Sequence, residues 1–537
     1  MLEARLMLMF WLDEVLWSAG RDAVSLAEAV LTEAGGVRTG GPSRAQERAR
    51  RRLEAAAGQV PERGGSALGS SRMGLWEVLW TKSTYAIPAA RAMRPGQLVS
   101  AVIGLNCLTM KKRMLGTLLA AYGPDAGPGG TFSITPLSFA LPEQTAEWAQ
   151  WLRERLAAKA ARAAEAAGEL RNGPRRQGQD QDPVHGDEGG FWILKTGQDA
   201  GKGLSLLSAE QALQYATAQL AKPQLPQAPE GQEEPLTHRL GSGSGPGGGG
   251  ASGGGSGGSA GGAAKRFALQ VAQLYVGRPL LVGGRKCHLR CWLLVTAHSP
   301  LRAYLHRRGL VLFSSELYDP AATAAAVAAS ASSPSAGATP LTGGAAGVGA
   351  ATAPPSSPAP APLPASHVTN YAQNNNTLVW SLGQLAEHLG DQAWGAVWAA
   401  LRAACARSLA AARSSLAEAN AWLRPAVQEY GFQLLGADFL LDERLRPWLL
   451  EFNSSPSIMV QHTDGTTRRL IFEQKYGMMR DIWEMVRWRV YRQEEEGGGP
   501  MAAAAGRRRR QPEGPAAAAR AEAAAAGEFE ALMPYMP

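Results

Sequence analysis

Cysteine is scarce in this sequence, with only four in 537 residues. So few thiols in so long a chain exclude a small scaffold held together by disulfide bonds. Long apolar runs are missing as well. The first 17 residues are apolar, but Glu3, Arg5, Asp13 and Glu14 interrupt them, so we expect an amphipathic helix there instead of a signal peptide or a membrane span. Both absences predict a soluble, intracellular protein.

Large apolar side chains are rare in several stretches, which hold much of the excess of 63 glycines and 34 prolines. The stretch 320–366, for example, has no charged side chain and is almost wholly Ala, Ser, Pro, Gly and Thr. Such compositions cannot build a core. We predict the following order of segments: an N-terminal helical segment (1–33), a low-complexity linker (34–68), an N-terminal lobe (74–157), a second linker (160–189), a central lobe (190–221), a disordered Gly/Ser-rich insertion (222–264), a core block (265–319), a disordered Ala/Ser/Pro-rich insertion (320–366), a C-terminal lobe (367–493) and a disordered or loosely helical tail (494–537).

The remaining blocks contain folded elements. The chain has 15 tryptophans and an ordinary apolar fraction of 45%, so substantial cores are expected. Because strand-like and helix-like patterns alternate along the chain, we predict an α/β protein with mixed sheets. The expected strands are 191–194, 267–276, 286–296, 302–313, 432–441 and 447–453, and the expected helices are 143–159, 382–422 and 467–492.

Two apolar runs around a polar turn at residues 442–446 predict a β-hairpin. Folding about this turn brings Asp438 opposite Glu451, and Asn453 shares their face because alternate residues of a strand point the same way. Two carboxylates at that spacing repel each other unless a cation lies between them. Carboxylate and amide oxygens suit Mg²⁺ held together with nucleotide phosphates. The alternative is three polar side chains that merely face solvent, which the apolar neighbours disfavour.

A second candidate is a strand with two different faces. Period-two alternation places Lys286, His288 and Arg290 on one face, and Cys287 and Cys291 on the other with leucines. Three neighbouring basic groups indicate an anionic ligand above them, although a surface strand with solvated charges is the alternative. The Cys-His-x-x-Cys order resembles half of a zinc site, but no second pair has matching spacing, so we expect reduced, buried thiols.

A third candidate is a strand that ends at Lys195 and continues into a glycine-rich loop with Lys202. Glycines let backbone N–H groups approach phosphates, and lysines neutralise them. The spacing is not that of a P-loop, and Gly-Lys loops are common turns. Only in combination with the hairpin and the basic strand does this loop predict a nucleotide site.

Taken in order, these motifs resemble those of the tubulin tyrosine ligase-like proteins, which are ATP-grasp amino-acid ligases. The resemblance covers about residues 76–490 apart from the insertions. The form of the motif at 367–371 and the ending of the motif at 432–457 look more like the branch that adds chains of glutamate or glycine. The segments that carry it are 94–100, 108–111, 134–142, 192–203, 273–281, 285–290, 367–371 and 432–457.

The resemblance implies an ATP-grasp-like, multi-lobed fold and an ATP- and Mg-dependent ligase. ATP would phosphorylate a carboxylate of the acceptor, and the amino group of a free amino acid would then attack the acylphosphate. Lys286 and Arg290 would be catalytic, and Asp438, Glu451 and Asn453 would hold Mg²⁺. The side chains implied in nucleotide binding are Lys111, Lys195, Lys202, Gln273, Leu274, Tyr275, Val276, Lys286, His288, Thr369 and Asn370.

The implied partners are the acidic C-terminal tails of tubulin and a free amino acid, with glutamate favoured, and neither nucleic acid nor a membrane is expected. A net charge of +8 agrees with an acidic partner. The implied location is the cytoplasm and its cytoskeleton, with the cilium or basal body as candidates. Oligomeric state does not follow from the sequence.

Three positions depart from the family pattern. His288 stands where the family has an acid, Leu312 where it has an arginine, and Thr196 where it has a proline. The departures keep a second hypothesis open, a family member that binds nucleotide or tubulin without ligating. A metabolic carboxylate–amine ligase is a third, which the N-terminal motifs disfavour.

Overall fold

The computed structural model of the chain describes most of the expected blocks. Two of the implied nucleotide-binding residues, Lys202 and Asn370, and the whole of the insertion 222–264 lie outside the described residues. The described residues are 7–10, 37–38, 78–80, 97–124, 133–172, 190–197, 204–221, 269–321, 377–489 and 515–532, with single positions at 87, 90, 91, 93, 130, 325, 361, 362, 366 and 369.

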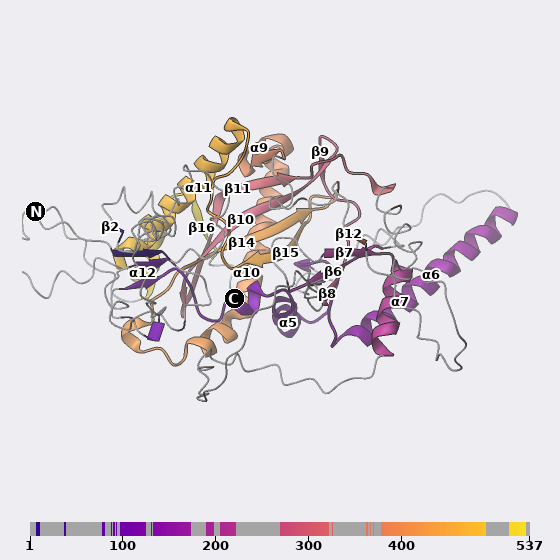
Figure 1. The fold of residues 1–537 in the computed structure, drawn as a ribbon, viewed down its shortest axis with the longest axis horizontal. Coiled ribbons are helices and arrows are strands. Elements are labelled where there is room, and N and C mark those ends of the chain that lie inside the picture. Colours follow the sequence, from indigo (N-terminus) through magenta and orange to yellow (C-terminus); the bar gives the residue numbers. More distant parts are fainter. Residues whose placement is uncertain are drawn as a thin grey trace, which may run out of the picture.

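A seven-stranded antiparallel sheet forms the centre of the molecule (Figure 1). Its main path runs β13-β11-β10-β14-β15, with β9 paired to β10 and β16 paired to β11. Long runs of Leu, Val and other apolar residues explain why the strands form and are buried. Their bounds are β9 (Leu281–Val282), β10 (Arg285–His298), β11 (Leu301–Phe313), β13 (Val379–Ser381), β14 (Gln433–Leu441), β15 (Pro447–Asn453) and β16 (Phe529–Ala531).

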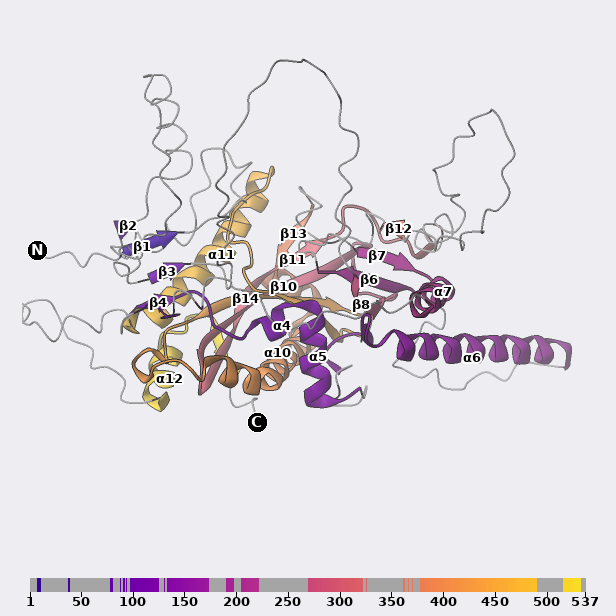
Figure 2. The same ribbon diagram turned by 60° about the horizontal axis from the view of Figure 1, so that its bottom comes forward.

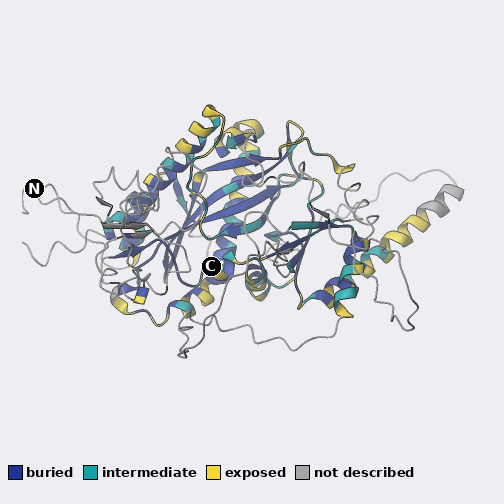
Figure 3. Ribbon diagram, in the orientation of Figure 1, coloured by how far each residue is buried: buried dark blue, intermediate teal, exposed yellow. Residues whose placement is uncertain are grey.

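Helices cover both faces of this sheet, so most residues of its long strands are buried (Figure 3). Figure 2 shows α5 and α10 on one side of the strands and α11 on the other. The first face packs the odd-numbered side chains of β10, such as Leu289 and Leu293, against α9 and α10. The second packs Trp292 and Leu294 against α11. The helices are α4 (Asn106–Thr109), α5 (Lys111–Tyr122), α9 (Leu382–Leu389), α10 (Asp391–Asn420) and α11 (Gly465–Val486).

A five-stranded antiparallel sheet lies beside the central one, in the order β12-β7-β6-β8-β5. It packs on α6 and α7 through the fully buried Trp148 and Trp192, whose ring centroids are 5.4 Å apart. The outer part of α6 extends away from the body (Figures 1 and 2). The bounds are β5 (Ser138–Ala140), β6 (Trp192–Thr196), β7 (Leu204–Leu207), β8 (Leu269–Leu274), β12 (Ala361–Pro362), α6 (Thr145–Asn172) and α7 (Ala209–Leu220).

A small parallel sheet near the N-terminus corrects one prediction. Met7–Phe10 form strand β1 and not part of an amphipathic helix. The other strands are β2 (Val37–Arg38), inside the stretch predicted as a linker, β3 (Val78–Trp80) and β4 (Leu98–Val99). A short apolar run fits a buried strand as well as a helix, and pairing with β2 and β3 decides between them here.

Two predicted helices differ from those in the structure. The helix expected over 382–422 is divided into α9 and α10 at Gly390, whose φ of 80° breaks the helix. The helix expected over 143–159 continues to Asn172, into the stretch 160–189 predicted as a linker. Its Ala, Arg and Glu residues have high helix propensity, so the helix persists where it has no apolar face to bury.

The tail predicted as disordered or loosely helical over 494–537 is instead ordered and packed over 515–532. It forms α12 (Pro515–Ala524) and β16, and it buries Glu522, Phe529 and Leu532 in the body. The sequence prediction failed because the stretch is rich in alanine and its few anchoring residues match partners far away in the sequence. The other segment boundaries remain predictions.

A short 3₁₀ helix, Pro425–Val427, joins α10 to β14. None of the described helices combines the length and the apolar character needed to cross a bilayer.

Candidate functional site

The predicted hairpin is confirmed as β14 and β15. Its register places Gly436 opposite Asn453 and Asp438 opposite Glu451, with an irregularity just after Asp438. At the turn, the carboxylate of Asp442 accepts hydrogen bonds from the backbone N–H groups of Arg444 and Arg446, both at 2.9 Å, and from the indole of Trp448 at 3.1 Å. These bonds hold the turn, and with it the register that brings the acidic residues together.

The oxygen-bearing side chains share one side of the sheet, and basic groups neutralise the carboxylates. Asn453 donates a hydrogen bond from Nδ2 to Asp438 Oδ2 at 3.1 Å. Arg290 makes a two-pronged ion pair with Asp438, in which Nη2 lies 2.9 Å from Oδ2. Lys111, the first residue of α5, lies 3.3 Å from Glu451. The predicted repulsion between two opposed carboxylates is therefore relieved by cations, as such a pair requires.

The alternation along β10 is also as predicted. Lys286 and His288 are buried on one side, while Cys287 and Cys291 belong to the core on the other. All four cysteines of the chain are free and buried. Because His288 points away from the two neighbouring thiols, the residues that resemble half of a zinc site do not converge.

Burial changes the charge of this row. It lowers the pKa of His288 to about 4, even though Asp438 acts in the opposite direction, so the imidazole is neutral at neutral pH. Its Nδ1 lies 2.7 Å from the hydroxyl oxygen of Thr369. Burial also lowers the pKa of Lys286 to about 7. Of the three side chains predicted to be cationic or titratable, His288 therefore adds no charge to the row at neutral pH.

Lys195 connects the two antiparallel sheets at the site. It lies on β6 of the five-stranded sheet, and its Nζ donates to the carbonyl oxygen of Leu450 on β15 at 3.4 Å. Burial lowers its pKa to about 8, opposed by the nearby Glu451 and assisted by Lys111. The site therefore lies where the two sheets meet, and each sheet contributes basic side chains to it.

The segment expected to frame an adenine, residues 273–276, leaves the five-stranded sheet next to this row. Gln273 is buried, and its Nε2 donates to Thr135 at 3.2 Å and to Ser138 at 2.9 Å. The hydroxyl of Tyr275 accepts a hydrogen bond from Lys286 Nζ at 3.0 Å, and Nζ lies 4.4 Å from the ring centroid. Leu274 and Val276 are half-buried on either side of it.

One basic residue of the site was missed by the sequence analysis. Lys475 lies on α11 and is only 8% exposed. Its Nζ donates to the carbonyl oxygen of Met459 at 2.6 Å. Burial, assisted by the charge of Arg290, lowers its pKa to about 7. A signal was present: Lys475 is in phase with the apolar residues Ile471, Met478 and Ile482, which makes it part of the buried stripe of the helix.

The residues present fit a magnesium ion. The donor set consists of two carboxylates and one amide, which are hard oxygen ligands. The described residues include no group of three or more His, Cys, Asp or Glu side chains that could hold a metal, so a magnesium site here would need the amide of Asn453 as its third ligand. Mg²⁺ usually keeps further positions for water and phosphate oxygens, so three protein ligands are sufficient.

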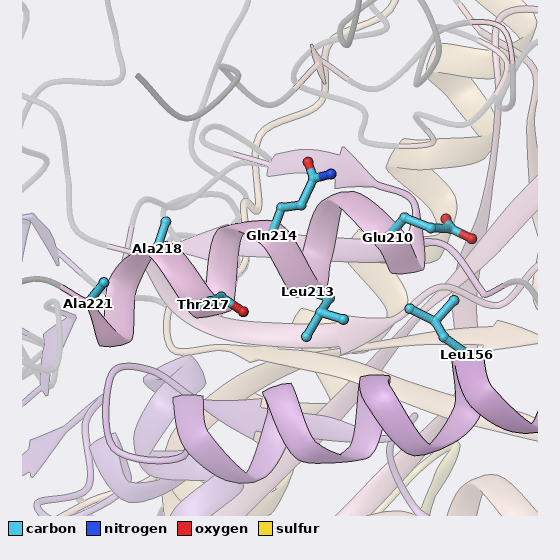
Figure 4. Close-up of a pocket in the computed structure, with 7 residues that line it drawn as sticks. All are labelled: Leu156, Glu210, Leu213, Gln214, Thr217, Ala218 and Ala221. Atoms are coloured by element: carbon cyan, nitrogen blue, oxygen red, sulfur yellow. The ribbon is translucent and has the colours of Figure 1, made fainter. Parts of the chain in front are cut away.

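A separate hollow of about 540 Å³ lies between α6 and α7 (Figure 4). Leu213, Ala218 and Leu156 give it a largely apolar lining, with Glu210 at one end. It contains none of the basic or acidic residues described above. The hollow is therefore no part of the candidate site.

Comparisons with known proteins assign the family. Residues 261–328 and 365–486, which include β10, Asp438, Glu451 and Asn453, match the Tubulin-tyrosine ligase family. The chain is similar to the tubulin polyglutamylase TTLL6 of Homo sapiens, with 25% identity over 225 residues that cover 39% of this chain and 21% of the relative. It is similar to the probable tubulin polyglutamylase ttll-9 of Caenorhabditis elegans, with 28% identity over 221 residues (39% and 40%).

A third relative belongs to another branch. The tubulin monoglycylase TTLL3 of Danio rerio is 30% identical over 205 residues, which cover 37% of this chain and 22% of the relative. The chain therefore spans less than half the length of each of these relatives. The matched segments, the ordered motifs and the site between the two sheets lead to one conclusion: the chain contains a domain of the Tubulin-tyrosine ligase family.

Proposed function

We propose that the protein is an ATP- and Mg-dependent ligase of the ATP-grasp type that joins an amino acid, glutamate in preference, to carboxylates of tubulin C-terminal tails. The observation that carries this proposal is the convergence of basic side chains from both sheets around the pair Asp438 and Glu451. The printed names of the relatives, most of them polyglutamylases and one a monoglycylase, support tubulin and favour glutamate.

The roles of the side chains follow from their positions. Lys195 and Lys286 would neutralise the phosphates of ATP, because both are buried amines whose lowered pKa would rise beside an anion, so that each is protonated when phosphates bind. Arg290, which lies next to the acidic pair, would stabilise the charge that develops on the transferred phosphoryl group and orient the acceptor carboxylate. Phosphoryl transfer depends mainly on such positioning and neutralisation.

Asp438, Glu451 and Asn453 would hold magnesium. The ion would supply positive charge to neutralise the phosphates. Tyr275, whose hydroxyl holds Lys286, would keep this lysine between the adenine segment and the phosphates. Thr369 would keep the neutral imidazole of His288 in place.

Purified protein incubated with ATP, Mg²⁺, tubulin and radiolabelled glutamate, glycine or tyrosine tests the proposal. We expect incorporation of glutamate into tubulin, and glycine in its place would assign the other branch. Glu451→Gln should abolish incorporation by removing a magnesium ligand, whereas Glu443→Gln, at an exposed ion pair with Arg278, is the matched control. Absence of incorporation of any of the three amino acids contradicts the proposal.

One observation favours the second candidate, a protein that binds nucleotide or tubulin without ligating. Leu312 lies opposite His288 on β11, is only 4% exposed and belongs to the apolar cluster under α11. The position at which the family has an arginine therefore adds no charge to the site. If this loss disables the protein, Leu312→Arg should create or raise ligase activity; if the site functions without the arginine, the variant should not exceed the wild type.

A further inference from the structure

We propose that Lys475, together with Arg290, forms a subsite for a carboxylate of one of the two substrates that the ligase joins. The inference rests on the proposed function, because it concerns the same site. It starts from an unusual position for a lysine: Lys475 lies in the buried stripe of α11, between Ile471 and Met478, where the neighbouring turns carry apolar side chains. This stripe faces the side of the central sheet that carries Arg290 and Trp292.

The charge of Lys475 is not balanced by the protein. Among the described residues, its Nζ bonds only to the carbonyl oxygen of Met459, and the charge that acts on it is that of the cation Arg290. A buried ammonium group has three N–H donors and is costly to leave without an anion. Arg290 in turn is held by Asp438. An added anion next to both basic groups would therefore be strongly favoured.

Basic side chains outnumber acidic ones around the site, which also favours an added anion. Five basic side chains surround the site, against two carboxylates, Asp438 and Glu451. The neutral His288 is not counted, and Lys286 and Lys475, whose pKa burial lowers to about 7, become fully charged only when an anion binds beside them. The five are Lys111, Lys195, Lys286, Arg290 and Lys475.

The position of Lys475 separates it from the nucleotide end of the site. Lys286 marks that end, because it bonds to Tyr275 beside the expected adenine segment. Arg290 lies four residues further along the same strand, roughly 13 Å away at about 3.3 Å per residue. Lys475 lies in the stripe of α11 that packs on Trp292 and Leu294, the residues that follow Arg290 on the same face of β10, and the charge of Arg290 acts on it. The anion at this end is therefore not the adenine-proximal phosphate but a group that meets the reacting phosphoryl.

Both substrates bring a carboxylate to that end: the acceptor side chain and the free amino acid. The chemistry that Lys475 recognises is the same for both, a planar carboxylate held by an ammonium and a guanidinium group. A purely structural role is the competing explanation, in which Lys475 serves only to fix the loop after β15 through Met459. If Lys475 binds a carboxylate, its positive charge is needed for substrate binding. If its role is structural, only the hydrogen bond to Met459 is needed.

Three variants separate these explanations. Lys475→Met removes both charge and donor, whereas Lys475→Gln removes the charge but keeps an N–H donor for Met459. Arg469→Met is the matched control, because Arg469 lies on the same helix but is exposed and pairs only with Glu473 in the described part of the chain. Thermal unfolding confirms that each variant is folded.

The primary readout is equilibrium binding by calorimetry in the presence of Mg²⁺ and a non-hydrolysable ATP analogue, with L-glutamate as one probe and a synthetic Glu-rich peptide as the other. We expect both Lys475 variants to bind one probe at least tenfold more weakly, as the loss of a charged hydrogen bond predicts, with unchanged affinity for the analogue. Weakened binding of glutamate identifies the free amino acid as the ligand, and weakened binding of the peptide identifies the acceptor.

Unchanged affinities for both probes in Lys475→Met overturn the proposal, and so does full recovery in Lys475→Gln, which would assign a structural role. If the Met and Gln variants fail to fold, the wild-type protein provides the test. Each carboxylate of glutamate or of the peptide is replaced in turn by its amide, and at one position this must weaken binding at least tenfold. If all the amides bind as tightly as the parent probes, the subsite is contradicted. A wild type that binds these probes as expected but transfers no amino acid contradicts the proposed function and leaves the subsite intact.

Discussion

Single residues at the site are tuned by burial more than by their intrinsic chemistry. Lys286 illustrates this, because burial lowers its pKa from 10.5 to about 7 in the free protein. In the unfolded chain it stays protonated up to its ordinary pKa, so the folded state binds fewer protons between pH 7 and 10.5. The contribution of Lys286 to the free energy of unfolding therefore increases with pH across this window and is smallest below it.

Nucleotide binding should accordingly be coupled to proton uptake. Phosphates beside Lys286 favour its charged form and raise its pKa, so at pH 8 the protein should take up a proton as ATP binds. Calorimetric titration in two buffers of different ionisation enthalpy measures this uptake, and Lys286→Met should reduce it. Identical enthalpies in both buffers would show that Lys286 does not meet the phosphates.

His288 gives a second prediction at this scale. The imidazole is neutral and lies 2.7 Å from Thr369, so it does not contribute a positive charge to the site at neutral pH. Because the imidazole is already uncharged, His288→Asn should change nucleotide affinity by less than about fivefold, whereas Lys286→Met should weaken it by at least tenfold. Direct titration with the non-hydrolysable analogue compares the two. An equal loss in both variants would show that His288 carries charge when the nucleotide is bound.

At the scale of elements, the β14–β15 hairpin determines whether the acidic pair exists at all. A shift of one residue would turn Asp438 or Glu451 to the opposite face of the sheet. The turn that prevents this shift is held by Asp442, which accepts two backbone N–H groups and one indole N–H. The chemistry of the site thus depends on a residue at the turn that faces none of the expected ligands.

Asp442→Ala should therefore affect both stability and binding. We expect the free energy of unfolding to fall by about 1–2 kcal/mol through the lost hydrogen bonds, and Mg²⁺-dependent nucleotide binding to weaken. Urea unfolding and calorimetry measure the two effects. Arg444→Ala is a suitable control, because only its backbone N–H takes part in the turn; a loss of similar size there would mean that Asp442 has no special role.

For the whole molecule, the C-terminal segment 515–532 stabilises the packing of distant elements against one another. Glu522 is completely buried and forms ion pairs with Arg302 on β11 and with Arg489, which follows α11. It also accepts hydrogen bonds from Tyr304 at 3.0 Å and Thr296 at 2.7 Å. The segment thereby joins α11, which carries Lys475, to the far end of the long β10–β11 hairpin.

Breaking this buried network should be costly. Glu522→Gln leaves the buried Arg489 without its carboxylate and Arg302 with Glu429 alone, and it should lower the free energy of unfolding by about 3–5 kcal/mol. Glu528→Gln is the control, since its pair with Arg308 is partly exposed and should contribute less than about 1 kcal/mol. Chemical denaturation of both variants measures the two losses in free energy of unfolding. Equal losses would contradict the stabilising role of Glu522.

The same network predicts the effect of acid. The arginines hold the pKa of Glu522 below its usual value, against the opposing effect of burial. The ionised carboxylate of Glu522 therefore contributes to the free energy of unfolding above about pH 4.5, the pKa of this group in the unfolded chain. This contribution is lost as the pH falls through the lower pKa that Glu522 has in the folded protein. The slope of stability against pH in this range should become smaller in Glu522→Gln.

Local patterns in the sequence were enough to predict much of the site. Alternation along 286–296 and the polar turn at 442–446 are short-range signals, and they placed Lys286, Arg290, Asp438, Glu451 and Asn453 on the faces where the structure has them. These features depend only on the period of a strand and on turn chemistry. Lys195 and Lys202 were predicted from a strand that continues into a glycine-rich loop, and Lys202 lies outside the described residues.

The features that only the tertiary structure decided depend on contacts between residues that are far apart in the sequence. The neutrality of His288, the burial of Lys475 and the docking of residues 515–532 all arise from packing between elements, which no local pattern encodes. The short apolar run Met7–Phe10 became a strand only because two other segments pair with it. By itself, the sequence determined the kinds of most of the central elements and the faces of the reactive side chains, since backbone periodicity is a local property. The charges of those side chains and the meeting of the two sheets were decided by the fold, because desolvation and long-range ion pairs exist only after the chain is packed.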